Sequence, residues 1–387
     1  MYKFIPLNTH SLSLIKPVNS QLNMFVCGTN TYAALCDYDH YPLRNKTLAI
    51  KNILKFLQYV DTLIYQKTTV KIKSREIRKI FSGEQYKAFL DILAELNIIT
   101  RVPYNDGIFY EPKKRYCQYR IHNSYMADKL GLIIADTYAP MKLSTDKKYP
   151  AKFEKAIRYT ECDFTGAVAA EYENYVDTGM SENKLRIRLS RLFALVGERY
   201  IKKGTNVDRI YSSFTNLSKI SRKYLHINNQ PYYSLDIKNC QPLLLCYLLR
   251  ESSMEMDSNY LSDCENAEIY YRFITGKKYK TKDDVKKPLY SAIYFDFKPH
   301  KKIAQKFKKL YPLTYGSLEL LHSCDSTVAS KLQNLEASVF NKVVPKKSKY
   351  FFTLFDAIYF TDKNDVDDLK KRITERFATY GITPKIA

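Results

Sequence analysis

Two short apolar segments in the C-terminal half, each interrupted by one aspartate, place the strongest constraint on the fold. Residues 232–237 have the pattern of a buried strand that ends at Asp236, and residues 349–362 have the pattern of an apolar hairpin that contains Asp356. An ionised carboxylate beside an apolar core is costly unless a cation compensates it, and a metal ion is one such cation. If the two strands are neighbours, their carboxylates converge. The alternative is two unrelated aspartates in turns.

A converging pair of carboxylates has a specific chemical use. Two divalent ions about 4 Å apart, held by such a pair, can activate an attacking oxygen and neutralise the charge that develops during in-line phosphoryl transfer. The pattern therefore makes phosphoryl transfer a candidate chemistry.

A third segment, residues 280–297, reads as a helix that tolerates Pro288 near a turn or kink. Lys282, Lys286, Tyr290 and Tyr294 recur every four residues and so share one helix face. Cations of this kind can hold a triphosphate, and an aromatic ring can stack on a nucleotide base. The alternative is a basic and aromatic surface stripe with no ligand.

The charge balance favours a polyanionic partner, because 62 Lys and Arg residues face 40 acidic residues for a formal net charge of +22. The apolar content of 45% argues against a mostly disordered basic chain. No apolar run approaches the ~18 residues that a membrane span needs. The first 25 residues lack the features of a secretory signal, so we expect a cytoplasmic protein with no membrane partner. The eight cysteines form no CxxC pair, which indicates neither a zinc site nor a disulfide framework.

The N-terminal half shows a helical pattern followed by a hairpin pattern. Apolar residues at helical spacing predict helices over 47–66, 74–81 and 83–99, and Asn105-Asp106-Gly107 predicts a hairpin turn. This order predicts a winged-helix-like domain over 45–125, and a helical and hairpin domain used only for packing is the alternative. We expect an N-terminal extension over 1–44, a connector over 126–182 and a C-terminal module over 183–387, which opens with a basic amphipathic helix over 182–203.

Together the three C-terminal segments resemble family-A DNA polymerases and the related single-subunit phage RNA polymerases. The segment DIKNCQP at 236–242 is similar to motif A of that family, which reads DYSQIEL, and the four-residue register from Lys282 to Tyr294 is similar to motif B. Phe355-Asp356 resembles the His-Asp of motif C. The resemblance covers about residues 183–387 and implies a polymerase-like palm with an antiparallel sheet and helical fingers and thumb. With the winged-helix-like domain predicted before it, the expected fold class is α+β.

Two further stretches look like family segments that contact nucleic acid. DRIYSSFTNLSK is similar to the family's TGRLSS…PNLQ stretch, and LQNLEA is similar to its glutamine-bearing helix. The resemblance implies nucleic-acid contacts for a set of polar residues, namely Arg209, Ser212, Asn216, Arg222 and Gln333.

The resemblance also implies roles at the reacting centre. Asp236 and Asp356 would bind two Mg²⁺ ions, with Mn²⁺ as a substitute. Lys282 and Lys286 would hold the triphosphate, and Lys286 would also protonate the leaving pyrophosphate. Tyr290 would stack on the incoming base and Tyr294 would lie against the template base.

The chain departs from the family pattern at two positions. Gln241 stands where DNA-polymerising members carry the glutamate that excludes ribose, so the sugar preference is open, and Phe355 replaces the motif C histidine. These departures leave a binding-only polymerase fold as an alternative.

Three functions are therefore compared. The first is a template-dependent nucleic-acid polymerase of a mobile element or virus, with or without primase activity, whose partners are a nucleic-acid template and primer and nucleoside triphosphates. The second is a non-catalytic replication initiator or transcription regulator that binds duplex DNA. The third is a metal-dependent nuclease that uses the same two acids.

Overall fold

The fold was analysed in a computed structural model. It describes residues 2–7, 22–43, 45–64, 69–81, 85–103, 116–138, 142–276, 278–324 and 327–387. The chain forms a mixed α/β structure with small antiparallel sheets, divided into two units. Unit 1 comprises residues 1–144, 160–200 and 213–229, and unit 2 comprises residues 145–159, 201–212 and 230–387. The units are interleaved along the chain, whereas the sequence analysis expected one domain after another.

One sheet of unit 1 combines the N-terminal segment with a strand far along the chain. The strands β1 (Tyr2–Pro6) and β2 (Leu22–Gly28) pair antiparallel with β6 (Leu130–Tyr138), which lies between them. The sequence analysis treated residues 1–44 only as an extension. Their strands and the helix α2 (Thr29–Asp37) instead belong to the fold of unit 1.

The segment predicted to be winged-helix-like forms three helices and a three-stranded sheet. The helices are α3 (Lys46–Leu63), α4 (Ser74–Phe81) and α5 (Tyr86–Glu95). The sheet has the order β3 (Thr69–Ile72), β5 (Cys117–Ile121), β4 (Ile99–Val102) and is antiparallel. The three predicted helices are confirmed with small shifts at their ends. The turn predicted at 105–107 lies outside the described residues, and the comparison with a winged helix stays a prediction.

Aromatic packing explains why these helices hold together. The ring of Phe81 lies 5.1 Å from that of Phe56 and stacks on that of Phe89 at 4.6 Å, so one side chain from each helix meets in the core. All three are buried to 1% exposure or less.

The remaining elements of unit 1 include two long helices, α8 (Phe164–Thr178) and α9 (Glu182–Phe193). The helix predicted over 182–203 is wrong in its second half, because α9 ends at Phe193 and residues 198–203 form the strand β9. Gly197, which has φ 90°, lies in the turn between the end of α9 and the start of β9, and glycine adopts this conformation readily. The short elements are α6 (Asn123–Met126), β8 (Glu161–Cys162), α10 (Lys219–Arg222) and β11 (Leu225–Ile227).

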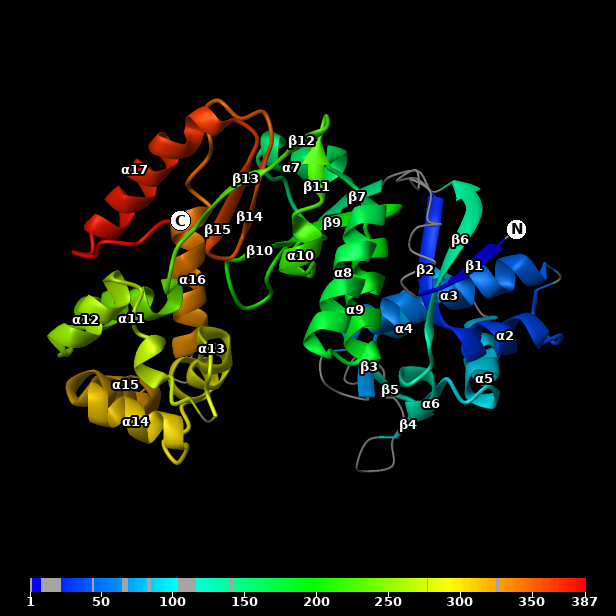
Figure 1. Ribbon diagram of the computed structural model, residues 1–387, viewed down its shortest axis with the longest axis horizontal. Coiled ribbons are helices and arrows are strands. Elements are labelled where there is room, and N and C mark those ends of the chain that lie inside the picture. Colours follow the sequence, from blue (N-terminus) through cyan, green and yellow to red (C-terminus); the bar gives the residue numbers. More distant parts are fainter. Residues whose placement is uncertain are drawn as a thin grey trace. The chain divides into compact units, whose positions relative to one another are not determined.

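Unit 2 contains the sheet that carries both predicted catalytic aspartates. Its order is β13 (Tyr233–Asp236), β15 (Ala357–Phe360), β14 (Phe351–Leu354), all antiparallel. The two strands of the hairpin are almost wholly buried, while Tyr233 and Ser234 of the edge strand β13 are exposed. The prediction of a buried strand at 232–237 is therefore only partly correct. Figure 1 shows this sheet beside α17 (Val366–Ala378).

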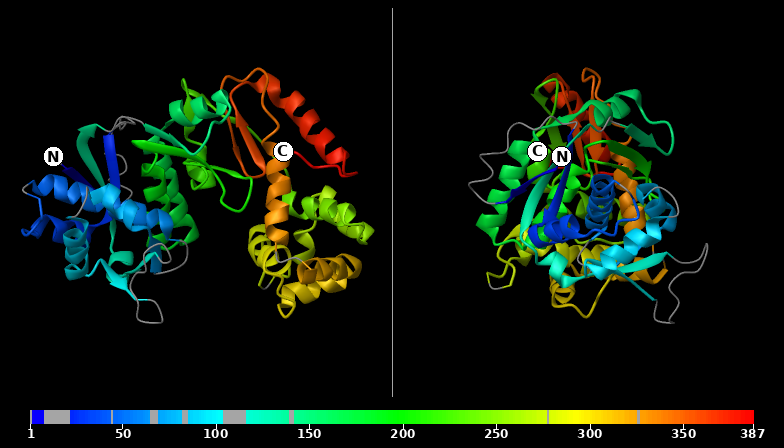
Figure 2. Two further views of the ribbon diagram at one scale, coloured as in Figure 1. Left: turned by 180° about the vertical axis from the view of Figure 1, so that it is seen from behind. Right: turned by 90° about the vertical axis from the view of Figure 1, so that its right-hand side faces the viewer.

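Helices complete unit 2, as Figure 2 shows from two further directions. The helix α16 (Val328–Phe340) packs against α11 (Cys240–Glu251) and contacts α17. The other helices are α12 (Ser258–Glu265), η2 (Tyr271–Phe273), α13 (Lys282–Leu289), the π-helical turn η3 (Tyr290–Phe295), α14 (Lys302–Leu310), α15 (Pro312–Cys324) and η4 (Lys363–Asp365). The remaining strands of unit 2 are β10 (Ile210–Ser212) and β12 (Gln230–Pro231). Two strands span the division in the chain: β7 (Lys142–Thr145) has its first three residues in unit 1, and β9 (Glu198–Lys203) has its first three residues in unit 1 and its last three in unit 2.

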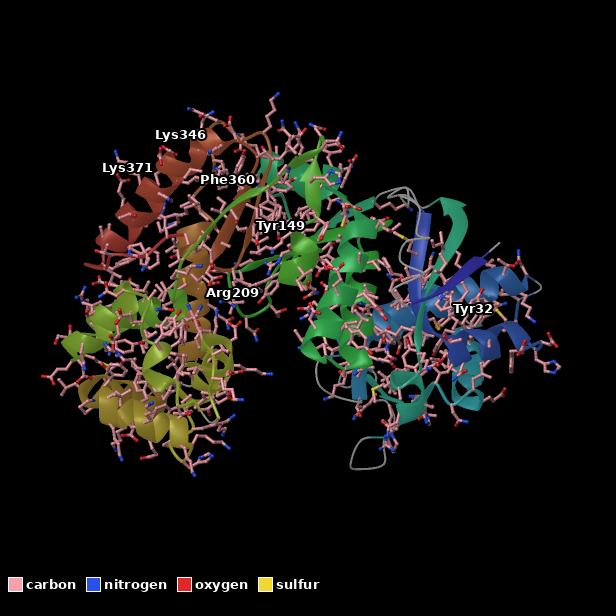
Figure 3. The ribbon with its side chains drawn as sticks, viewed as in Figure 1. Tyr32, Tyr149, Arg209, Lys346, Phe360 and Lys371 are labelled. Carbon is pink, nitrogen blue, oxygen red and sulfur yellow. The ribbon has the colours of Figure 1, made fainter. Side chains whose placement is uncertain are left out.

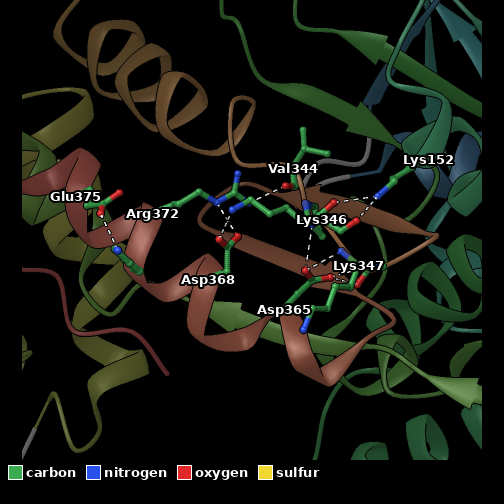
Figure 4. Close-up of polar contacts among 11 residues, drawn as sticks. Lys152, Val344, Lys346, Lys347, Asp365, Asp368, Arg372 and Glu375 are labelled. Atoms are coloured by element: carbon green, nitrogen blue, oxygen red, sulfur yellow. Dashed lines mark hydrogen bonds and ion pairs between the residues drawn. The ribbon is translucent and has the colours of Figure 1, made fainter.

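The helix α7 (Ala151–Tyr159) comes early in the chain but belongs to unit 2. The ring of Phe153 meets that of Phe351 on β14 edge to face at 5.7 Å. Lys152 donates to the carbonyl oxygens of Pro345 and Lys346, both at 3.0 Å (Figure 4). Asp365 fixes the same loop, because its carboxylate accepts from the backbone N–H groups of residues 346–348.

No helix in the described part of the chain is long and apolar enough to cross a lipid bilayer.

Candidate active site

The antiparallel pairing of β13 with β15 brings Asp236 and Asp356 to the same end of one sheet. Asp236 is the register partner of Ala357, the residue after Asp356. The backbone N–H of Ile237 donates to the carbonyl oxygen of Asp356 at 3.1 Å. The two strands are thus adjacent, which is the arrangement that the sequence analysis required for convergence.

Asp356 lies in the tight turn of the β14–β15 hairpin. Leu354 pairs with Ala357, so Phe355 and Asp356 form a two-residue turn. Phe355 has φ 56°, which is unfavourable for a bulky residue that is not glycine. Backbone strain of this kind persists only where surrounding contacts enforce it, and it concentrates at functional sites.

The two carboxylates influence each other electrostatically. Burial raises the pKa of Asp356 above its usual value, and the negative charge of Asp236 raises it further. The positive charges of Lys286 and Arg209 act in the opposite direction. Asp236 is more open, with 40% of its side chain exposed and the Lys238 ammonium group 3.4 Å away. Three cationic side chains, those of Lys286, Arg209 and Lys238, therefore act on this pair of carboxylates.

This donor set fits Mg²⁺. Magnesium usually binds through one or two protein carboxylates and takes its other ligands from water and substrate phosphates. Among the described residues no group of three or more His, Cys, Asp and Glu side chains could hold a metal ion. Asp236 and Asp356 match the number of carboxylates that Mg²⁺ commonly takes from a protein.

A third carboxylate, which the sequence analysis missed, lies next to this pair. Glu336 on α16 is only 2% exposed. Burial raises the pKa of Glu336 to about 7, and the negative charge of Asp356 also raises it. The hydrogen bonds that Glu336 accepts lower its pKa and so oppose these two effects. A sequence signal existed, because Leu332, Glu336 and Phe340 are spaced by four residues, so that the acid occupies an apolar helix face.

Glu336 ties two predicted site residues together. Its Oε2 accepts from the Arg209 guanidinium at 2.7 Å and from the Gln241 amide at 2.6 Å. Its Oε1 is buried and has no hydrogen-bond partner among the described residues. The Arg209 side chain (labelled in Figure 3) also lies over the ring of Phe355, 4.9 Å from its centre. Arg209 was predicted to contact a nucleic-acid backbone, but in this structure its guanidinium is engaged by Glu336 and Phe355.

The two lysines and two tyrosines that recur every four residues lie on two kinds of helix. Lys282 and Lys286 are in α13, while Tyr290 and Tyr294 lie in the π-helical turn η3 that follows Pro288. Pro288 removes one backbone donor within α13, and the regular i to i−4 pattern is lost shortly after it. The four residues therefore do not share one α-helical face over their whole length, which corrects the helix predicted over 280–297.

The two tyrosines are held by other rings. The hydroxyl of Tyr290 bonds to that of Tyr270 at 2.7 Å. Tyr294 is 0% exposed and its hydroxyl bonds to that of Tyr260 at 3.2 Å. A contact of the Tyr294 ring with a template base would require the ring to leave this buried position.

The remaining predicted nucleic-acid contacts are dispersed. Gln333 is half-buried on α16, whereas Ser212 is 1% exposed, so its hydroxyl is inaccessible to a nucleic-acid backbone in this conformation. Asn216 and Arg222 belong to unit 1. There Asn216 donates to the Tyr200 hydroxyl at 3.4 Å, and Arg222 donates to the carbonyl oxygen of Ser218 at 3.3 Å. Unit 2 thus contains the three acids together with Lys282, Lys286, Gln241 and Arg209. Asn216 and Arg222 are not part of this group.

The chain was compared with known protein families, curated proteins and solved structures. No family model matches the sequence, and no curated protein does. Among solved structures, the chain is similar to the POL domain of Pol1 from M. smegmatis, in complex with a DNA primer-template and dNTP. The TM-score is 0.34 at 12% identity, and the alignment covers 57% of this chain and 54% of that chain. The chain thus spans about half of the matched structure, and a TM-score at this level does not define a shared fold.

Proposed function

We propose that the chain is a template-dependent nucleic-acid polymerase, a nucleotidyltransferase of a mobile element or virus that uses metal-assisted phosphoryl transfer. The observation that carries this proposal is the pairing of β13 with the β14–β15 hairpin, which brings Asp236 and Asp356 together near the charge of Lys286. The net charge of +22 supports a nucleic-acid partner as template and primer.

In the proposed reaction, the 3′-oxygen of a primer attacks the α-phosphorus of a nucleoside triphosphate. A new phosphorus–oxygen bond forms, and the bond from the α-phosphorus to the bridging oxygen breaks. The electron pair of that bond leaves with pyrophosphate, and the proton of the 3′-hydroxyl passes to solvent. Mg²⁺ bound by Asp236 and Asp356 would supply charge neutralisation and make the attacking oxygen more nucleophilic.

The protein groups have distinct roles in this scheme. Asp236 and Asp356 hold the cations, and Lys286 neutralises the triphosphate and donates a proton to the leaving pyrophosphate. Lys282 adds charge further along α13, and it is close enough to Asp236 for their charges to interact. Tyr290, which is half-buried, is the ring available to the incoming base.

Primer extension with labelled nucleotides and Mg²⁺ tests the proposal. Asp356→Asn should lower the rate by about 10³-fold, the size of effect seen when a group that stabilises transition-state charge is lost. Asp367→Asn is the matched control, because Asp367 is an exposed aspartate on α17 outside the site. It should leave the rate unchanged.

The competing functions give different products in the same assay. Shortening of the nucleic acid that disappears in Asp356→Asn would identify a nuclease. Specific duplex binding, without extension and unaffected by Asp356→Asn, would identify a non-catalytic initiator or regulator. Equal extension by wild type and Asp356→Asn would contradict the proposed site.

A further inference from the structure

An open pocket of about 530 Å³ lies beside Asp236 within unit 2, and four of its eight lining residues are cationic. Four positively charged side chains line it, those of Lys238, Arg272, Lys282 and Lys385, together with Glu268 and Tyr271. Only Lys282 of these was singled out by the sequence motifs. A pocket with four cations and one carboxylate has an excess of positive charge that a polyanion would balance.

The backbone fixes these cations close to the candidate catalytic acids. Lys238 follows β13 two residues after Asp236. The backbone N–H of Lys238 donates to the carbonyl oxygen of Lys385 at 2.9 Å, so the 385–387 segment runs alongside this part of the chain. The pocket is therefore continuous with the end of the sheet that carries Asp236.

Not all of this positive charge is compensated. Asp263 pairs with Arg272 at 2.6 Å, and Asp236 lies 3.4 Å from Lys238. In the described part of the chain, neither Lys282 nor Lys385 forms an ion pair within 4.0 Å. Burial lowers the pKa of Lys282, and the positive charges of Lys286 and Lys238 lower it further. This mutual repulsion of cations would be relieved by a bound anion.

We propose that this pocket binds the pyrophosphate that nucleotidyl transfer releases. The inference rests on the proposed function. The two lysines of α13 connect the reacting centre with the pocket, because Lys286 acts on Asp356 and Lys282 lines the pocket wall. Pyrophosphate leaves the α-phosphorus with the electron pair of the broken bond and passes from Lys286 to Lys282, Lys238 and Lys385.

The geometry favours a compact anion over a nucleic-acid backbone. The cations converge on one pocket, whereas contacts to a strand of phosphodiesters would be spread along a groove. Pyrophosphate also concentrates more negative charge in a smaller volume than a phosphodiester does. Half or more of the Arg272 and Tyr271 side chains is exposed, at 51% and 59%, so an entering anion meets open walls.

Calorimetric titration of the full chain with sodium pyrophosphate, in the absence of nucleic acid, tests the assignment. Lys385→Ala and Lys238→Ala should each weaken binding by about 10-fold, the loss expected for one charge-assisted contact. Lys371→Ala is the matched control, because Lys371 is a 76% exposed lysine on α17 (Figure 3). It should bind like wild type. Lys385→Gln should reproduce Lys385→Ala if charge is the cause.

Three results would overturn the assignment. One is the absence of pyrophosphate binding by the wild type, and another is equal binding by the wild type and the Lys238→Ala, Lys385→Ala double variant. The third is competition between pyrophosphate and a short single-stranded oligonucleotide, together with an affinity for the oligonucleotide that falls about 10-fold in Lys385→Ala. That result would assign the pocket to a nucleic-acid backbone.

The outcome separates this inference from the proposed function. If the protein binds pyrophosphate in a Lys385-dependent way but does not extend primers, the pocket assignment is supported and the proposed polymerase function is refuted. Primer extension by the wild type, with pyrophosphate inhibition that is unchanged in Lys385→Ala, would support the polymerase and refute the pocket.

Discussion

Each unit of the molecule contains a buried glutamate paired with an arginine. The two glutamates differ in the hydrogen bonds that their carboxylate oxygens accept. In unit 1, Glu171 on α8 is 0% exposed. One of its oxygens accepts from Arg188 at 2.9 Å, and the other accepts from the hydroxyls of Ser218 and Ser221. Both oxygens are used, so this glutamate joins α8 to α9 and to the start of α10.

Glu336 in unit 2 receives both of its donors on one oxygen, and the other is buried without a partner among the described residues. Its pKa is raised to about 7, first by burial and then by Asp356. A buried carboxylate that is only half satisfied costs stability, and such groups occur where function requires them. The contrast separates a carboxylate that joins three helices from one that lies beside the candidate catalytic acids.

The largest effect on stability is expected for a substitution of Glu171. Glu171→Gln should lower the free energy of unfolding by about 3 kcal/mol, because an amide cannot accept from Arg188 and from both serines at once. Glu336→Gln at pH 8 should cost less than about 1 kcal/mol, because the charged form there is opposed by burial and by Asp356. Urea unfolding measures both. Equal losses would show that the two glutamates are equivalent.

A second prediction concerns pH. The folded-state pKa of Glu336 is about 7, above the ordinary value of 4.5, so the folded protein keeps a proton that the unfolded chain releases. Its contribution to stability is therefore complete below pH 4.5 and is lost as the pH rises through about 7. Between pH 5 and 8 the wild type should lose on the order of 2 kcal/mol relative to Glu336→Gln.

Unfolding of the two proteins in parallel across this range checks the pH prediction. Parallel curves, or a wild type that gains stability relative to Glu336→Gln as the pH rises, would contradict it.

The smallest effect on stability is expected for a substitution of Gln241, the residue that donates to Glu336. Gln241→Glu would place a second carboxylate about where the Gln241 amide now meets Glu336 at 2.6 Å. Two such groups cannot both be ionised without repulsion, so the variant should be less stable than wild type by about 1 kcal/mol at pH 8 and near wild type at pH 5. The same variant tests the proposed function, because a glutamate there should shift primer extension towards deoxyribonucleotides.

The strongly periodic parts of the fold were predictable from the sequence. The helix over 74–81 occurs with the predicted bounds, and Asp236 and Asp356 were selected because each interrupts an apolar strand. Periodicity reports local amphipathicity and therefore works where one element has one buried face. It failed at 194–203, where the helix has already ended at Phe193 and residues 198–203 form the strand β9.

Packing between elements was not predictable in the same way. Tyr294 follows Lys282 at a multiple of four residues, yet it is fully buried and lies in the π-helical turn after Pro288, where the α-helical spacing no longer applies. Asn216 matches a family segment in its local sequence, but local sequence does not decide which unit a residue joins. Glu336 was overlooked because an acid on an apolar face was read as part of a helix and not as a buried charge.

The interleaved course of the chain limits how the protein can be dissected. A fragment starting at residue 183 would lack α7, and Phe351 of the hairpin would lose the ring of Phe153 that covers it. It would also carry residues 183–200 and 213–229 without the rest of unit 1. On the ribosome, likewise, unit 1 cannot be completed before Asn229 has been synthesised, and the residues of α7 emerge long before the sheet they will cover. Neither half of the gene product is thus an independent module that recombination could move to another protein by a single cut.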